Sequence, residues 1–258
     1  MALLNVRSVA RTRSTRSAAA AVAATLVLAA CVPQRPEERL VEPGLRLDTA
    51  HLTEGTTRWR VTVVQDTVKR DLGVMTSSTS FVDYDGLPAV LLVRTSPTER
   101  GVIVDSVLSL RHTLAPVWQH SHQPTRTMLL DFANSGVTGE WAPADSAMRK
   151  VHHPTGRPVF DATSQGLLVT SLPLADGYRT LLPIYSFELA GMEIDTLQVL
   201  GTEQVSAPDG SMRDAWKIGF YDPFVTATIW VDQQARRILR EDIVSRRTGA
   251  TFREVPLS

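Results

Sequence analysis

Hydrophobic and polar residues alternate along most of the chain after residue 57. In residues 58–67 the apolar positions Trp59, Val61 and Val63 alternate with Arg60 and Thr62. This period of two predicts a strand with one buried face. Residues 75–84 and 87–95 are two more such runs, separated only by Asp85-Gly86. Asp-Gly at this place favours a tight hairpin, because glycine accepts the positive φ that the turn requires.

The rest of the chain continues the pattern. Further strands are predicted over residues 101–114, 125–132, 137–141, 178–189, 194–207, 211–221, 225–231 and 237–245. Short turns join several of them, such as Asn134-Ser135-Gly136 and Pro208-Asp209-Gly210. Strands joined in this way form an antiparallel meander, and a large meander must curve to protect its edges.

Evidence for helices is confined to two segments. Residues 161–172 have Asp161 or Thr163 as a possible N-cap and Pro173 after the last position, and residues 141–150 could form a second short helix. We therefore expect a mainly β (α+β) fold, in which a curved antiparallel sheet or open half-barrel wraps around one or two short helices.

The N-terminus has the pattern of an export signal. Four arginines precede the apolar run of residues 18–30, which is too short to cross a bilayer and ends just before Cys31. Residues 28–31 (LAAC) resemble the bacterial lipobox, which implies cleavage before Cys31 and lipidation of its thiol. Val32 follows, not Asp, and by the enterobacterial sorting rule this implies an outer-membrane lipoprotein that faces the periplasm.

These features predict three parts. Residues 1–30 are expected to be a signal peptide, residues 31–57 a lipidated tether rich in proline and polar residues, and residues 58–258 a single β-rich half-barrel domain. The 27 Lys and Arg of the whole chain equal its 27 Asp and Glu, but the signal peptide holds four of the arginines and no acid. The remainder carries 23 basic and 27 acidic residues, a net charge of −4, which argues against nucleic acid as a partner.

The C-terminal strands carry a resemblance to a known family. Gly177-Tyr178, residues 181–183 (LLP), 205–211 (VSAPDGS), 214–217 (DAWK) and 228–232 (TIWVD) are similar to the periplasmic domains that share the open half-barrel of the lipoprotein carriers LolA and LolB. This resemblance covers roughly residues 161–245. It implies a sheet around short helices, with an apolar cleft that accepts acyl chains.

The cleft would be lined by side chains of these strands. Trp216, Ile218 and Phe220 share one face of a strand, and Thr228 and Trp230 share one face of the next. An aromatic stripe of this kind also fits an ordinary core. The expected ligand-lining residues are Leu182, Trp216, Ile218, Phe220 and Trp230.

Histidines offer an alternative, metal-based chemistry. His120 and His122 would point the same way on a strand, and His112 or His153 with Asp131 could complete a metal site. The flanking Gln119, Gln123 and Pro124 favour instead an exposed polar loop.

Signals for catalysis are weak. The sequence has no Gly-x-Ser-x-Gly motif and no glycine-rich phosphate loop. Glu241 and Asp242 are adjacent on a predicted strand, so they should point to opposite faces and form no carboxylate pair; solvated surface is the better interpretation. The arginines at 236, 237, 240, 246 and 247 fit a salt-bridged surface or, alternatively, a patch for lipid headgroups.

We expect a non-enzymatic envelope lipoprotein without a cofactor, attached to the membrane through Cys31, that binds or transfers a hydrophobic ligand such as a lipid or acyl chain. The alternative is a structural or accessory subunit of an envelope complex, with a protein partner and no ligand cavity. A histidine metal site or a hydrolase is a third possibility.

Overall fold

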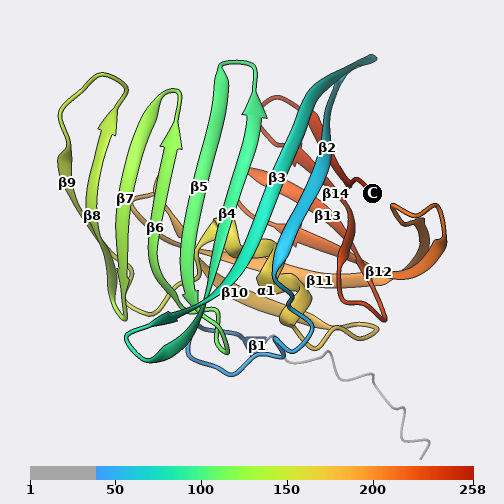
Figure 1. Ribbon diagram of the computed structural model, residues 1–258, viewed down its shortest axis with the longest axis horizontal. Coiled ribbons are helices and arrows are strands. Elements are labelled where there is room, and N and C mark those ends of the chain that lie inside the picture. The colour runs from blue at the N-terminus through green and yellow to red at the C-terminus, as the bar shows by residue number, and fades with distance from the viewer. Residues whose placement is uncertain (1–38) are drawn as a thin grey trace, which may run out of the picture. The chain divides into compact units, whose positions relative to one another are not determined.

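The structure, a computed structural model, describes residues 39–258, and these form one curved 15-stranded sheet with a short helix in its hollow (Figure 1). The strands are β1 (Arg39–Leu40), β2 (Gly55–Gln65), β3 (Val68–Tyr84), β4 (Leu87–Thr98), β5 (Gly101–Leu110), β6 (Pro116–Gln123), β7 (Arg126–Ala133), β8 (Gly136–Pro143), β9 (Arg149–Pro154), β10 (Arg179–Ser186), β11 (Gly191–Ser206), β12 (Met212–Tyr221), β13 (Val225–Asp232), β14 (Ile238–Ser245) and β15 (Thr251–Pro256). A 3₁₀ turn, η1 (Ala162–Ser164), leads into the helix α1 (Gln165–Ser171).

The sheet consists of two meanders joined side by side. The strand order is β1-β10-β11-β12-β13-β14-β15-β2-β3-β4-β5-β6-β7-β8-β9, and every pair is antiparallel except β1 with β10. The last strand, β15, pairs with β2, so Phe252 lies opposite Val63. The C-terminal meander of β10–β15 is thereby continuous with the N-terminal meander of β2–β9. The sheet does not close into a barrel, which confirms the predicted open half-barrel.

Local sequence signals place most of the turns. In the hairpin between β3 and β4, Asp85 and Gly86 have φ values of 51° and 78°, which confirms the predicted Asp-Gly turn. The helix predicted over residues 161–172 is found as η1 followed by α1. Asp161 is the N-cap of η1: its carboxylate accepts a hydrogen bond from the Thr163 amide at 2.8 Å, and Ser164 is the N-cap of α1.

The second predicted helix, residues 141–150, is wrong. Trp141 lies in β8, opposite Met128 of β7, and the strand continues to Pro143. Residues 149 and 150 begin β9, which pairs with β8. Pairing on both sides therefore overrides the weak helical pattern of this segment.

The predicted boundary of the tether at residue 57 also needs correction. Arg39 and Leu40 pair with β10, and the Val41 amide donates to the Leu181 carbonyl at 2.9 Å. Val41 and Leu52 are buried in the main core, and β2 already begins at Gly55. Residues 39–57 thus belong to the fold. The signal peptide, Cys31 and the first part of the tether lie outside the described residues.

The main core forms where α1 packs on the C-terminal meander. Leu168, Val169 and Leu172 of the helix region are fully buried against apolar side chains of β10–β13. At the end of the helix, the Arg236 guanidinium donates to the carbonyls of Thr170 and Leu172, which have no partner within the helix. The strand residues in this core are Val90 of β4 and Leu182, Ile184, Leu197, Val199, Ile218, Phe220, Ala227, Ile229 and Val231 of β10–β13.

The contribution of this helix can be measured with Leu168→Ala. We expect a loss of about 2–5 kcal/mol in the free energy of unfolding, because the substitution leaves a cavity between the helix and the sheet. Leu200→Ala is the matched control: Leu200 is 48% exposed, so its loss should change stability by less than about 0.5 kcal/mol. Urea denaturation compares the two variants with wild type, and similar losses in both would contradict the assigned core.

Candidate functional site: a cavity in the hollow of the sheet

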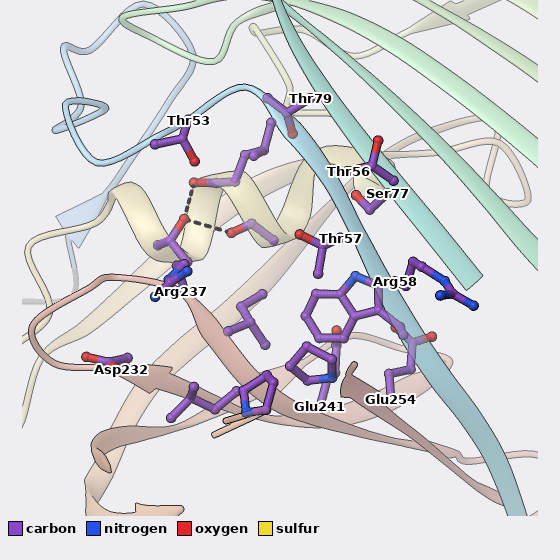
Figure 2. A pocket seen from close by; sticks show the side chains of 18 of the residues that line it. Thr53, Thr56, Thr57, Arg58, Ser77, Thr79, Asp232, Arg237, Glu241 and Glu254 are labelled. Atoms are coloured by element: carbon purple, nitrogen blue, oxygen red, sulfur yellow. Dashed lines mark hydrogen bonds between the residues drawn. The ribbon is translucent and has the colours of Figure 1, made fainter. Parts of the chain in front are cut away.

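A cavity of about 530 Å³ lies beside α1, in the hollow of the sheet. Its walls come from the start of the helix, from β2, β3, β4, β14 and β15, and from the tip of the β11–β12 hairpin (Figure 2). Small-molecule sites in proteins span about 300–1,000 Å³, so the space suits a small ligand or one chain of a lipid.

One part of the lining is apolar. Side chains of the helix and of the strands that face it from across the cavity supply this surface. They are Leu52, Trp59, Met75, Leu92, Leu167, Ile238, Leu239, Pro256 and Leu257. The Trp59 indole contributes a buried Nε1 that makes no hydrogen bond within residues 39–258.

A strip of hydroxyl groups forms a second part of the lining. It follows β2 and β3 and the segment before them, and its members are Thr53, Thr56, Thr57, Ser77 and Thr79 (Figure 2). The cavity is therefore amphipathic: hydrocarbon can pack on one part, while polar groups of a ligand can hydrogen-bond to the other.

Three charged side chains meet in the wall formed by β4, β14 and β15. The Arg94 Nη2 donates to both carboxylate oxygens of Glu254, at 2.9 and 2.7 Å, and its Nε donates to the Met75 sulfur at 2.8 Å. Glu241 lies directly opposite Glu254 in the β14–β15 register, and the two carboxylates lie on the same side of the cavity (Figure 2). One guanidinium thus faces two carboxylates.

Glu241 is the carboxylate without a partner in this group. Glu254 is 7% exposed and engages Arg94, whereas no hydrogen bond or ion pair reaches the half-buried Glu241 from any described residue. Burial raises the pKa of Glu241 to about 7, and the Glu254 carboxylate adds to that rise, while Arg94 acts in the opposite direction. Near pH 7 the Glu241 carboxyl group is therefore present in both its protonated and its ionised form.

Most other charges of the lining have partners. Arg213 pairs with Asp209 at 3.3 Å in the hairpin tip, and Asp232 accepts from the amides of Gln234 and Ala235 in the turn after β13. Arg236 is held by the end of the helix. These contacts fix the rim of the cavity.

The five residues expected to line a ligand cleft do not line this cavity. Leu182, Ile218 and Phe220 are buried in the main core against the helix, and Trp216 is half-buried beside them. The shared face of Trp216, Ile218 and Phe220 was predicted correctly, but the helix occupies the space in front of it. These four side chains form part of an ordinary core, which was the alternative interpretation of the aromatic stripe.

Trp230 lies on the opposite face of the sheet. Its neighbour in register is Lys217, whereas Ile218 is opposite Ile229. The indole Nε1 donates to Glu203 at 3.1 Å, and the Arg240 guanidinium lies 4.3 Å from the ring centre. The grouping of Trp230 with Ile218 is therefore wrong, because the strand register places their side chains on different faces.

His120 and His122 lie on β6, so the predicted loop is wrong at this place. Both are exposed and share one face of the strand; His120 stacks on Trp118, and His122 contacts the Thr127 hydroxyl at 3.2 Å. His153, on β9, contacts the Tyr185 hydroxyl instead. Within residues 39–258, no three His, Cys, Asp or Glu side chains converge in a way that could hold a metal ion.

Sequence reasoning missed the charged group of the cavity. Glu241 and Asp242 do point to opposite faces, as predicted, and Asp242 pairs with Arg253. The interpretation of Glu241 as solvated surface is wrong, because the strand face that carries it turns into the hollow. A signal was present: Arg94 is in phase with the apolar Val90 and Leu92 of its strand, which marks an inward-pointing charge.

Comparison with known proteins places the chain in a family. A family model described as "Protein of unknown function (DUF3108)" matches residues 55–243. The chain belongs to the DUF3108 family. The match runs from β2 to β14. In this DUF3108 protein, the matched region includes Arg94 and Glu241 and ends before Glu254. No curated protein matches it.

Two solved structures are similar to this DUF3108 chain at low identity. A DUF1329 family protein from Desulfovibrio piger is 13% identical, with a TM-score of 0.31, over 80% of this chain and 85% of the other. A protein from Bacteroides fragilis with a YmcC-like fold, described as a candidate exported protein, is 11% identical, with a TM-score of 0.25, over 79% and 94%. In the part of the DUF3108 chain that the structure describes, no helix has the length and apolar character to span a bilayer.

The raised pKa of Glu241 predicts a pH-dependent effect of Glu241→Gln. The folded chain holds the Glu241 proton more tightly than the unfolded chain does, so the contribution of this group to stability falls as pH rises from about 4.5 to about 7. Glutamine removes that penalty. We expect the variant to be more stable than wild type by about 1–3 kcal/mol at pH 8 and nearly equal at pH 4.5.

Denaturant titrations at the two pH values measure this difference. Other buried acids, such as Asp195 with a pKa raised by burial to about 8, are unchanged in both proteins and so cancel in the comparison. The exposed Glu99→Gln serves as a control and should show no pH-dependent gain. A constant difference between Glu241→Gln and wild type at both pH values would be evidence against a buried, unpaired carboxyl group.

Proposed function

We propose that this protein is a non-enzymatic lipoprotein of the cell envelope that binds or transfers a hydrophobic ligand in the cavity beside α1. The observation that carries the proposal is the cavity itself: about 530 Å³ of space, partly lined by apolar side chains, lies within the hollow of a curved sheet. An acyl chain or a similar hydrocarbon would lie against Leu92, Leu167 and Ile238, and the polar end of the ligand would reach the polar part of the lining.

The N-terminal sequence supports the location. A signal peptide followed by Cys31 would attach the chain by acyl groups, and Val32 would direct it to the outer membrane, with the domain in the periplasm. The resemblance of residues 161–245 to the LolA and LolB carriers supports a binding role with no cofactor. In this proposal, the membrane holds the protein close to the source of its ligand.

A second candidate is an accessory subunit of an envelope complex. Ile194, Tyr221 and Phe224 favour it, because these exposed apolar side chains lie at the same end of β11, β12 and the turn after β12. Such a surface suits a protein partner. In that case the cavity would hold only solvent.

Ligand binding is tested with Ser77→Trp, which places an indole in the cavity from β3. We expect mass spectrometry of organic extracts to find an apolar ligand in the purified wild-type chain and at least fivefold less in this variant. Ser80→Trp is the matched control: Ser80 is exposed on the same strand and does not line the cavity, so its ligand content should equal that of wild type.

Empty extracts from wild type, together with a Ser77→Trp variant that is as stable as wild type, would favour the accessory subunit over a ligand carrier.

The anchor is tested with Cys31→Ser. We expect wild type to incorporate labelled palmitate and to sediment with membranes, and the variant to do neither, because the acylated thiol is missing. Val32→Asp is the control: it should remain acylated but move from the outer to the inner membrane. Membrane association of Cys31→Ser equal to that of wild type would contradict lipidation at this residue.

A further inference from the structure

The charges around the cavity leave Glu241 uncompensated. Arg94 is committed to Glu254 by two hydrogen bonds. Arg240 precedes Glu241 in the chain and Arg253 precedes Glu254, and both engage Asp242 on the opposite face of the sheet. A carboxylate in such a place carries a high cost unless a proton or a cation joins it. The proton is one solution, and a cationic group of a ligand is the other.

Charged side chains from several parts of the lining contribute to the electric field inside the cavity. The charged or titratable lining residues are His51, Arg58, Arg94, Asp209, Arg213, Asp232, Arg236, Arg237, Glu241, Glu254 and the C-terminal Ser258. Arg213, Arg236 and Arg94 have the partners described above, whereas Arg58 and Arg237 are exposed and lie at the rim (Figure 2). Inside the rim, the group of Arg94, Glu254 and Glu241 therefore has one negative charge in excess when both acids are ionised.

We propose that the ligand of this cavity is an amphiphile with a primary ammonium group, which binds at Glu241 while the hydrocarbon part packs against Leu92, Leu167 and Ile238. This inference rests on the proposed function and specifies the class of its ligand. The ammonium replaces the proton as the partner of the Glu241 carboxylate and forms a charge-assisted hydrogen bond in a partly desolvated site.

The geometry disfavours an anionic head inside the cavity. A sulfate or carboxylate at the same place would meet the carboxylates of Glu241 and Glu254, and Arg94 already donates from its Nη2 to both oxygens of Glu254. A neutral alcohol could bind to the protonated form of Glu241, but its affinity would not rise when Glu241 ionises. The three head groups should therefore differ in both affinity and pH dependence.

Calorimetric titration of the full chain with three probes of equal chain length tests this order. The probes are octylammonium, octan-1-ol and octyl sulfate, each below its micelle concentration. At pH 8 we expect octylammonium to bind at least tenfold more tightly than either of the others. At pH 5 the preference should fall below threefold, because Glu241 is then protonated while the amine keeps its charge.

Glu241→Gln should bind octylammonium and octanol within twofold of each other at both pH values, whereas Glu99→Gln should keep the wild-type preference. If Glu241→Gln does not fold, the wild-type pH profile alone decides. Equal binding of all three probes, or tighter binding of octyl sulfate, would overturn the ammonium assignment and leave the proposed function intact. Failure of every probe, together with empty lipid extracts, would refute the proposed function as well.

Discussion

The packing of one short helix against one half of a curved sheet governs the rest of this structure. Helix α1 has seven residues, and its buried face meets β10–β13, where it fills the hollow with a dense core. Seven residues extend only about 10 Å along the axis, so the helix leaves much of the remaining sheet uncovered. The space that remains between α1 and β2–β4 and β14–β15 is the cavity.

The same arrangement explains why charged residues persist inside the molecule. In a fully packed half-barrel, Arg94, Glu241 and Glu254 would be buried without water, and such a group is seldom more stable than apolar side chains of similar volume. At the wall of an open cavity, the ion pair of Arg94 and Glu254 keeps some access to solvent, and Glu241 can take up or release a proton. The site thus combines a hydrocarbon surface with a carboxyl group whose ionisation state is adjustable near neutral pH.

Two distant parts of the chain must come together before this site exists. Arg94 belongs to the N-terminal meander and Glu254 to the last strand, and the pairing of β15 with β2 brings them to the same side of the sheet. Glu254 and residues 256–258 are therefore part of the cavity wall. The integrity of the cavity therefore depends on the pairing of β15 with β2, which joins the two meanders.

The sequence by itself determined the class of the fold and much of its detail. Alternation of apolar and polar residues marked most strands, the Asp85-Gly86 turn followed from the φ that glycine permits, and Asp161 marked the start of the 3₁₀ turn that leads into the helix, because these signals are local. Strands such as β6 and β15, with mixed polarity or short length, gave no clear local signal and became strands by pairing.

Only the tertiary structure decided which face of each strand turned inward and what filled the space in front of it. Trp216, Ile218 and Phe220 shared a face as their spacing required, yet the helix covers that face, while the register of β13 carries Trp230 to the other side. Glu241 and Glu254 became neighbours through strand pairing, which no local spacing records. Periodicity determines that a face exists, whereas burial and partners depend on contacts between residues far apart in the chain.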